Sequence, residues 1–236
     1  MHMSLKEKKL SELERLQEYA SMLSHNLKTP ITGIKMMAEV LKDMEDPEDM
    51  QSVAADIYDA TVRLQAFYRQ MEEVYKNVYL PPEPPENISI SKELEKVKMH
   101  LVAQIADSRA VINSDFAEGD TIFFRTLSLN SILLNLLSNA IKYAKPGVQP
   151  KILVQTTYYT NEYLLLRVSD NGIGINLTKY GDKVFGLFEK FTDHPDATGM
   201  GLYITKNQVE SMGGDIWLES EPGVGSTFFL TLPLPK

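Results

Sequence analysis

Cysteine is absent from the 236 residues, which excludes a disulfide framework, a thiol nucleophile and zinc sites built on thiolates. Long apolar runs are also missing, and no segment approaches the roughly 18 residues that indicate a membrane span. Basic residues are in the minority, because 24 Lys and Arg stand against 32 Asp and Glu, a formal net charge of −8. Without a dense basic block, bulk electrostatics does not favour a nucleic acid or an anionic membrane as a partner. These absences predict a soluble, cytoplasmic chain with no membrane contact.

Proline divides the chain into two parts of different character. Four of the five residues from Pro81 to Pro85 are proline, and such a run cannot continue a helix and favours an extended spacer. The part before it is helix-like, whereas the part after it contains strand-like runs and glycine turns. We therefore predict an α+β protein with a helical domain over residues 1–79, a linker over 80–87 and a mixed domain over 88–236.

The first domain carries a seven-residue apolar repeat in two arms. The first arm has Leu13, Ala20, Leu27, Ile34 and Leu41, and the second has Met50, Ile57, Leu64, Met71 and Val78. Between the arms, Asp46 is the expected N-cap and Pro47 the first helical residue. The repeat predicts a helical hairpin with a coiled-coil-like seam. Because one hairpin cannot shield both apolar stripes, we expect two copies to form a homodimeric four-helix bundle. The alternative is an antiparallel pair within one chain.

The second domain shows a mixed order of helix and strand signals. Helices are predicted over 91–108, 125–144 and 202–212, and strands over 110–116, 151–157, 163–169, 215–220 and 227–232.

His25 falls on the side of the first helix that faces away from the seam. Leu23 and Leu27 occupy the two seam rows, so both ring nitrogens of His25 should meet solvent. Pro30 removes a backbone hydrogen bond five residues later and is expected to bend the helix beside His25. A coiled coil does not need this defect, which suggests a reactive site. An ordinary surface histidine is the plainer alternative.

A polar face is expected near the end of the apolar helix over 125–144. At 100° per residue, Asn135, Asn139, Lys142 and Tyr143 share an arc of about 100°. Carboxamide oxygens can ligate Mg²⁺, an ammonium group can neutralise phosphate, and a phenol can lie against a base. An amphipathic helix with its polar face in water is the alternative reading.

A second motif, Asp170-Asn171-Gly172-Ile173-Gly174, directly follows a predicted strand. An acid at the end of a strand can accept a hydrogen bond from an exocyclic amine, and this selects adenine over guanine. Gly172 and Gly174 allow the backbone to turn tightly and approach a ligand. Taken alone, the motif also fits a simple turn.

A third motif contains Gly199 and Gly201 and opens the helix that begins at Leu202. Glycines before a helix N-terminus offer free N–H groups to a phosphate. The connection over 175–197, which includes Lys190, is long enough to predict a lid over the site. Its aromatic residues could instead form a small satellite core.

Together these elements resemble the ATP-binding domain of the histidine kinase, gyrase, Hsp90 and MutL superfamily. The matching residues are Asn139, Asp170, Gly172, Gly174, Gly199 and Gly201. Two stretches resemble the histidine kinase branch, namely Leu187-Phe188-Glu189-Lys190-Phe191 and Gly225-Ser226-Thr227-Phe228. The segment His25-Asn26-Leu27-Lys28-Thr29-Pro30 resembles the phosphoacceptor box of sensor histidine kinases. Three positions depart from the pattern, since Asn26 replaces an acid, Ala197 a glycine and Lys190 an arginine.

The resemblance implies a sensor histidine kinase core, with a two-layer α/β sandwich that binds ATP and Mg²⁺. It places Asn139 and Asn135 at the metal, Asp170 at adenine, and Lys142 and Lys190 toward the phosphates, with Tyr143, Gly172, Gly174, Gly199, Gly201 and Leu202 completing the nucleotide site. His25 would accept the phosphoryl group and pass it to an aspartate of a separate response-regulator receiver domain. Asn26 and Thr29 complete the catalytic set, and Thr29 would orient water when the regulator is dephosphorylated.

Asn26 leaves two alternatives open, because a carboxamide cannot accept a proton as an acid's carboxylate does. One alternative is a protein that acts mainly as a phosphatase toward its regulator. The other is a non-catalytic module in which ATP only sets the conformation. The segment is expected to be the core of a larger sensor.

Overall fold

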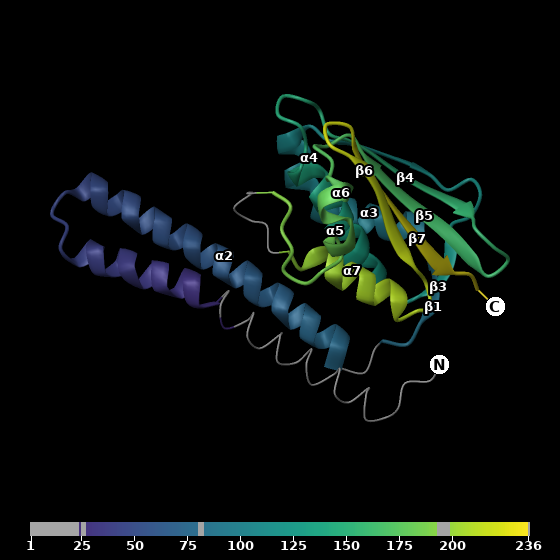
Figure 1. Ribbon diagram of the computed structural model, residues 1–236, viewed down its shortest axis with the longest axis horizontal. Coiled ribbons are helices and arrows are strands. Elements are labelled where there is room, and N and C mark those ends of the chain that lie inside the picture. The colour runs from purple at the N-terminus through teal and green to yellow at the C-terminus, as the bar shows by residue number, and fades with distance from the viewer. Residues whose placement is uncertain (1–23, 25–26, 80–82, 193–198, 236) are drawn as a thin grey trace. The chain divides into compact units, whose positions relative to one another are not determined.

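The computed structural model describes residues 24, 27–79, 83–192 and 199–235, with only the backbone of residues 70, 73–79 and 182. The chain divides into two compact units, residues 1–72 and 73–236 (Figure 1). His25 and Asn26, the central residues of the predicted phosphoacceptor box, lie outside the described residues. Thr29 is described and lies exposed on a helix of the first unit.

The first unit is a helical hairpin, as the heptad repeat predicts. A helix described over residues 27–42 is followed by α2 (Pro47–Tyr79), and the two run side by side (Figure 1). Asp46 caps α2, because its Oδ1 atom accepts hydrogen bonds from the backbone N–H groups of Glu48 at 2.8 Å and Asp49 at 3.3 Å. These two acids also occupy the first turn, where they complement the helix dipole. The predicted cap is confirmed.

The seam predicted by the repeat is the less exposed side of the hairpin. Half-buried or buried seam residues are Leu27, Ile34, Leu41, Ile57, Ala60, Leu64 and Met71. Apolar side chains nonetheless remain exposed on the same unit, and they include Ile31, Met36, Val40, Met50, Tyr58, Val62 and Tyr68. One hairpin therefore leaves much of its apolar surface uncovered.

The second unit contains a five-stranded sheet of order β2-β4-β5-β7-β6. The strands are β2 (Val111–Asp115), β4 (Lys151–Tyr158), β5 (Tyr163–Asp170), β6 (Ile216–Glu221) and β7 (Gly225–Pro233). Strand β2 pairs with β4 in parallel, and the remaining neighbours are antiparallel. A separate two-stranded antiparallel sheet joins β1 (Glu86–Ser89) to β3 (Thr121–Phe124). Neither β1 nor β3 is among the elements expected from the sequence.

The hydrophobic core lies between one face of the large sheet and a layer of helices. The helices are α3 (Ile90–His100), α4 (Val102–Ser108), α5 (Thr126–Lys142) and α7 (Gly201–Glu210). Helix α5 contributes Leu129, Ile132, Leu133, Leu136 and Leu137, all at most 1% exposed. In the strands, burial alternates with the pleat, so that one face meets the helices and the other meets solvent (Figure 1). Each fully buried Leu or Ile stabilises this two-layer sandwich by about 1.5–3 kcal/mol.

One helix predicted over 91–108 is divided at Leu101, whose backbone departs from helical geometry at φ −93° and ψ 7°. Helix α3 has a clear beginning at Ser89, which accepts a hydrogen bond from the backbone N–H of Lys92 at 3.3 Å. Leu101 is 2% exposed and packs in the core. The break therefore lets two short helices follow the curved face of the core better than one straight helix.

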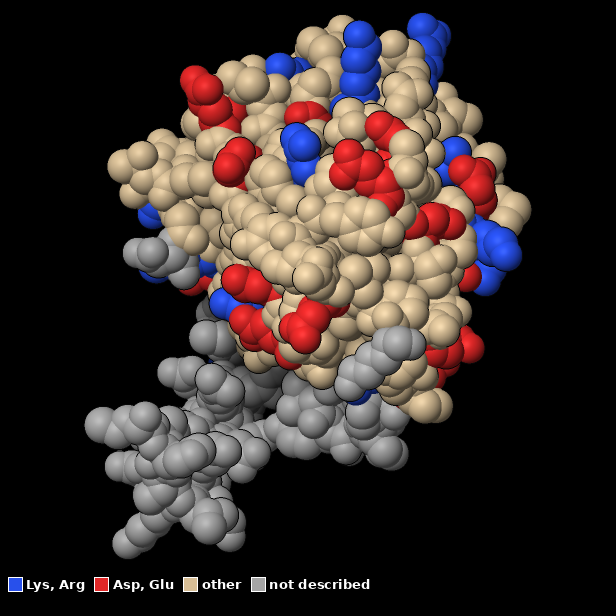
Figure 2. Space-filling model, turned by 90° about the vertical axis from the view of Figure 1, so that its right-hand side faces the viewer, with Lys and Arg blue, Asp and Glu red and all other residues tan. Residues whose placement is uncertain are grey.

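No helix among the described residues is long and apolar enough to cross a membrane. On the face of the molecule shown in Figure 2, Lys and Arg side chains are scattered among Asp and Glu rather than gathered into a patch.

Candidate functional site

The polar face of α5 is where the predicted nucleotide residues begin to meet. Asn135 and Asn139 are one helical turn apart, and Nδ2 of Asn139 donates a hydrogen bond to Oδ1 of Asn135 at 3.2 Å. Nδ2 of Asn135 in turn donates to Oγ1 of Thr205 on α7 at 2.9 Å. Both asparagines are half-buried. The predicted arc of polar residues on this helix is therefore linked to the helix that follows the third motif.

The third motif contacts the same face of α5 through Gly201, the first residue of α7. A Cβ atom at this position would lie 2.1 Å from Oδ1 of Asn135, far inside contact distance. Only a residue without a side chain allows the backbone to approach the carboxamide this closely. The glycine that sequence alone predicts for phosphate binding thus also makes room for Asn135.

Asp170 ends strand β5 and turns its carboxylate back into the loop that follows. Its Oδ1 atom accepts a hydrogen bond from the backbone N–H of Gly172 at 2.7 Å. Burial raises the pKa of the Asp170 carboxyl above its ordinary value, and backbone hydrogen bonds from Gly172 and Ser226 and the charge of Lys145 partly oppose that rise. A carboxylate so placed keeps acceptor capacity for a further donor.

The Asp170 loop packs against the end of α5. The backbone N–H of Ile173 donates to the carbonyl oxygen of Tyr143 at 3.0 Å. The backbone of Gly172 lies so close to that carbonyl that a Cβ atom would come within 2.6 Å of it. Lys142 lies beside the same residue, with Nζ 5.2 Å from the centre of the Tyr143 ring. The second motif thus meets the first within one turn of Asn139.

A hairpin turn between β6 and β7 holds the Asp170 loop from the other side. Gly174, at φ +70°, lies against the backbone of Glu221, where a Cβ atom would come within 2.1 Å of the carbonyl oxygen. The backbone N–H of Gly223 donates a hydrogen bond to the carbonyl oxygen of Ile173 at 2.8 Å. The carbonyl oxygen of Gly223 in turn accepts a hydrogen bond from Nζ of Lys145 at 2.8 Å. The loop is therefore rigidly seated on both sides.

The connection predicted as a lid contains a short helix, α6 (Leu177–Tyr180), and a 3₁₀ turn (Gly181–Lys183). The Tyr180 and Phe191 rings pack against each other at 5.1 Å between centroids. Gly199 lies against the backbone of Phe188, itself at φ +62°. Residues 193–198, with Ala197, lie outside the described part.

Two further predicted site residues have different surroundings. Lys190 lies on the connection over 175–197, and Leu202 lies in α7. Lys190 is exposed on this connection, whereas Leu202 packs against the core at the start of α7. The structure therefore joins the Asn135, Asp170 and Gly201 motifs, while Lys190 stands on the adjoining connection.

Sequence reasoning assigned no role at the site to three residues that shape it, namely Thr205, Lys145 and Ser226, although Ser226 lies in one of the stretches that resemble the histidine kinase branch. The role of Thr205 is revealed by its hydrogen bond from Asn135, and the role of Ser226 by the register of its strand. Strand pairing places Ser226 opposite Asp170. Lys145 was detectable in principle, because it is a further basic residue just after the predicted polar face.

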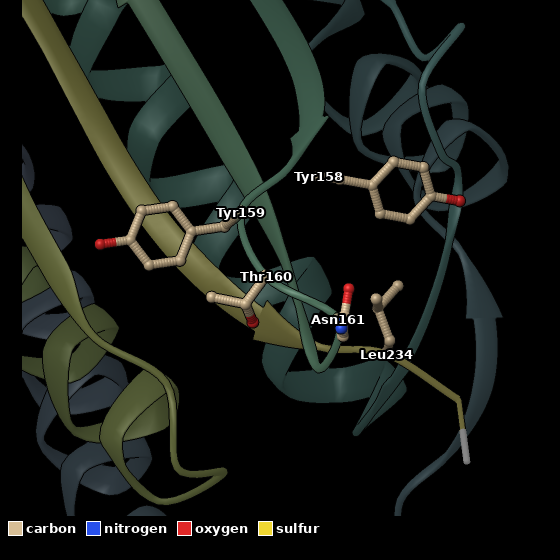
Figure 3. Close-up of a pocket in the computed structure, with 5 residues that line it drawn as sticks. All are labelled: Tyr158, Tyr159, Thr160, Asn161 and Leu234. Carbon is tan, nitrogen blue, oxygen red and sulfur yellow. The ribbon is translucent and has the colours of Figure 1, made fainter.

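A separate open pocket of about 410 Å³ lies at the β4–β5 turn, and its lining residues are Tyr158, Tyr159, Thr160, Asn161 and Leu234 (Figure 3). Figure 3 shows Tyr158 and Tyr159 pointing to opposite sides of the turn. Strand β5 separates this turn from Asp170 by about 24 Å, at roughly 3.4 Å per residue. The pocket is thus distinct from the site around α5.

The donor set around α5 fits a magnesium ion that is held mainly by a ligand. Among the described residues there is no group of three or more His, Cys, Asp or Glu side chains that could hold a metal ion. The carboxamides of Asn135 and Asn139 are neutral oxygen donors, and Mg²⁺ usually takes one or two protein oxygens together with substrate phosphates and waters. The site is therefore suited to a metal that arrives with a triphosphate.

Two family models match the chain in sequence order. The phosphoacceptor model "His Kinase A (phospho-acceptor) domain" matches residues 15–77. The model "Histidine kinase-, DNA gyrase B-, and HSP90-like ATPase" matches residues 125–236, which include all three nucleotide motifs.

Several curated proteins are similar over nearly the whole chain. The aerobic respiration control sensor protein ArcB of Escherichia coli K12 is 30% identical over 227 residues, which cover 92% of this chain and 28% of ArcB. The sensor protein RprX of Bacteroides fragilis is 28% identical over 247 residues, covering 100% of this chain and 46% of RprX. The autoinducer 2 sensor kinase/phosphatase LuxQ of Vibrio harveyi is 28% identical over 92% of this chain and 26% of LuxQ. The chain thus spans less than half of each relative.

Solved structures share the fold. The histidine kinase AdeS of Acinetobacter baumannii gives a TM-score of 0.71 at 18% identity. The match covers 90% of this chain and 98% of the AdeS chain. The histidine kinase ThkA in complex with the response regulator protein TrrA gives a TM-score of 0.75 at 21% identity, over 97% of this chain and 64% of that one. The predicted order of a helical hairpin and an α/β sandwich is confirmed by these likenesses.

Proposed function

The chain belongs to the sensor histidine kinases, and we propose that it is an autokinase core that transfers the γ-phosphoryl group of ATP to His25. One observation carries this proposal: the three sequence motifs converge on α5. Gly201 and Thr205 lie against Asn135, while Gly172 lies against Tyr143. Motifs that are separate in sequence thus form one site with the chemistry that a nucleotide needs.

Each part of that site takes a distinct part of ATP. The Asp170 carboxylate accepts a hydrogen bond from the exocyclic amine of adenine. Lys142 and Lys190 neutralise phosphate charge, and the backbone N–H groups at the start of α7, from Gly199 to Gly201, meet the phosphate oxygens. When bound, Mg²⁺ supplies further positive charge at the phosphates, held from the protein side by the face that carries Asn139 and Asn135.

The reaction is an in-line displacement at the γ-phosphorus atom. A ring nitrogen of neutral His25 supplies the electron pair for the new N–P bond, while the bond from the γ-phosphorus to the bridging oxygen breaks and ADP leaves with that electron pair. The ring then loses its proton to solvent, and phosphohistidine remains. Catalysis of this kind depends mainly on positioning and charge neutralisation, and the rigid seating of the Asp170 loop supports both.

The phosphoryl group then passes from His25 to an aspartate of a response-regulator receiver domain. The ThkA structure contains a response regulator as its partner, which supports the same class of partner here. The exposed apolar side chains of the hairpin support a homodimer, because a second hairpin would bury them in a four-helix bundle.

A labelling experiment tests the proposal directly. Incubation with ATP labelled at the γ-phosphate and Mg²⁺ should give protein-bound label that is stable in alkali and lost in acid. The label should vanish in His25→Ala and persist in His100→Ala, which removes an exposed histidine of α3. Label that survives in His25→Ala refutes His25 as the acceptor. Wild-type protein that binds Mg²⁺ and ATP but takes no label under any metal refutes the autokinase.

A second candidate, net phosphatase activity toward the regulator, is favoured by the residues that flank His25. Asn26 stands where the family has an acid. Thr29 stands where the family has the residue that orients water for dephosphorylation of the regulator. LuxQ, one of the similar proteins, is named a sensor kinase/phosphatase. The test is the rate at which a phosphorylated receiver domain loses its phosphate. A phosphatase should speed this loss with wild type and not with Thr29→Ala, whereas a slow kinase should speed it with neither protein.

A further inference from the structure

A chain of two hydrogen bonds, which we call the amide relay, joins α5 to α7. It runs from Nδ2 of Asn139 to Oδ1 of Asn135, and from Nδ2 of Asn135 to Oγ1 of Thr205. Each carboxamide gives its nitrogen to the next acceptor, so the relay has a direction. An amide whose NH₂ group is turned one way presents its oxygen the other way. In this arrangement the orientation of Asn139 is linked, through Asn135, to the residue at the far end, Thr205.

The surroundings of Thr205 indicate that its hydroxyl group, and not its volume, matters at this position. It is 1% exposed, on the face of α7 that also buries Ile204, Gln208 and Val209. A valine would fill a site of this shape without a polar atom to satisfy, whereas a buried hydroxyl needs a hydrogen-bond partner. The only hydrogen bond of the Thr205 side chain to a described residue is the one from Asn135.

The other end of the relay is Oδ1 of Asn139, the atom of this residue that could ligate a cation. No hydrogen bond to a described residue engages Oδ1 of Asn139, so this atom remains available as an oxygen donor. A reversed Asn139 amide would instead present an NH₂ group, which cannot ligate a cation. Oδ1 of Asn135, by contrast, is occupied by Asn139 and closely faced by Gly201. The two carboxamides are therefore not equivalent toward a metal.

We propose that Thr205 is a positioning residue that acts through Asn135 to hold Asn139 with Oδ1 facing the metal-bound phosphates. This inference rests on the proposed function, which supplies ATP and Mg²⁺. Asn139 is then the metal ligand, and Asn135 is the element that orients it. Because Thr205 lies on α7, the relay also makes the metal ligand sensitive to the position of this helix.

Equilibrium binding with and without a divalent cation tests the inference. Thr205→Val removes the acceptor at nearly constant volume, and Thr205→Ser restores it. The affinity of Thr205→Val for ATP in Mg²⁺ should fall by about tenfold or more, the usual loss when a group that orients a metal ligand is removed. Its affinity for ATP in EDTA should stay within about twofold of wild type, and Thr205→Ser should match wild type in both buffers.

Thr156→Val is the matched control for loss of a buried threonine hydroxyl. Thr156 is 3% exposed and donates to the carbonyl oxygen of Gly119, away from α5 and α7. Its thermal unfolding should shift as Thr205→Val does, with no change in either binding measurement. Should Thr205→Val fail to fold, Asn135→Ala interrupts the same relay at a half-buried position and is expected to show the same selective loss in Mg²⁺.

Nuclear magnetic resonance of the nucleotide-free protein provides a readout that does not depend on bound metal. The side-chain amide signals of Asn135 and Asn139 should both shift in Thr205→Val and neither should shift in Thr156→Val. An equal loss of affinity with and without Mg²⁺, unchanged binding, or an unmoved Asn139 amide would overturn the positioning role alone. Wild-type protein that binds no ATP in either buffer would instead overturn the proposed function together with it.

Discussion

The carboxamide of Asn135 and the backbone of Gly201 touch in a way that no other residue at position 201 permits. A Cβ atom there would lie 2.1 Å from Oδ1 and 2.8 Å from Cγ of Asn135. This contact joins two motifs that are far apart in the sequence. It also ties the first turn of α7 to the face of α5 that carries Asn139.

Replacement of this glycine tests the contact. In Gly201→Ala the new methyl group must displace the Asn135 carboxamide, which breaks its hydrogen bond to Thr205. We expect the affinity for ATP in Mg²⁺ to fall by about tenfold to a hundredfold, as measured by calorimetry. Gly33→Ala is the control, because nothing lies within 4 Å of a Cβ atom at that helical position. It should leave binding unchanged and slightly stabilise the hairpin. Wild-type affinity in Gly201→Ala would contradict the contact.

Much of the fold can be predicted because single helices and strands have strong local patterns. Helix α5, expected over 125–144, runs from Thr126 to Lys142, since its apolar period and length leave little choice. Strands β1 and β3 were not predictable in the same way. Each has only four residues, and β1 begins at Glu86, directly after the prolines. Each of these short strands is recognisable only from its pairing with the other.

The site shows the same division between local and long-range information. Asp170, Gly172 and Asn139 are recognisable from the sequence because each lies in a motif whose spacing carries a chemical meaning. Thr205 lies in no such motif, and the motif that contains Ser226 does not assign a chemical role to this residue. Thr205 is reached through a helix-to-helix contact, and Ser226 through the register of β5 with β7. The roles of Thr205 and Ser226 depend on long-range packing, which a local sequence pattern cannot show.

The N-cap of α2 predicts a measurable contribution to the stability of the hairpin. Asp46→Ala leaves the backbone N–H groups of Glu48 and Asp49 without their side-chain acceptor. The free energy of unfolding should fall by about 1 kcal/mol, as measured by urea denaturation at a fixed protein concentration. Glu45→Ala is the control, because exposed Glu45 forms no hydrogen bond or ion pair with a described residue. Equal effects of the two substitutions would rule out a cap.

Asn26, the residue after the proposed phosphoacceptor His25, predicts a gain of kinase activity on substitution. Asn26→Asp restores a carboxylate that can accept a proton beside His25. A positioned base typically contributes about 10²–10⁴-fold, so the initial rate of label incorporation should rise by about tenfold or more. Asn161→Asp adds the same charge at the exposed β4–β5 turn and should leave the rate unchanged. An unchanged rate in Asn26→Asp would show that proton acceptance at this position does not limit the reaction.

Burial raises the pKa of the Asp170 carboxyl, and this predicts a pH dependence of ATP binding. Protonation would remove the acceptor that we propose for the adenine amine, so the affinity for ATP should decline as the pH falls through that raised pKa. The decline should therefore begin at a higher pH than an ordinary aspartate would give. Asp170→Asn should bind ATP weakly at all pH values and show no step of this kind.

The same shift fixes the sign of a stability effect that needs no nucleotide. Because the pKa of Asp170 is higher in the folded than in the unfolded chain, the folded state binds the proton more tightly, and linkage makes the free energy of unfolding rise as the pH falls through this interval. The unfolding free energy of wild type minus that of Asp170→Asn should therefore increase from neutral pH toward about pH 4, near the pKa of an unperturbed aspartate. Urea denaturation of both proteins across this range measures the difference. A difference that decreases with falling pH would mean that hydrogen bonds from Gly172 and Ser226 outweigh burial and depress the pKa instead.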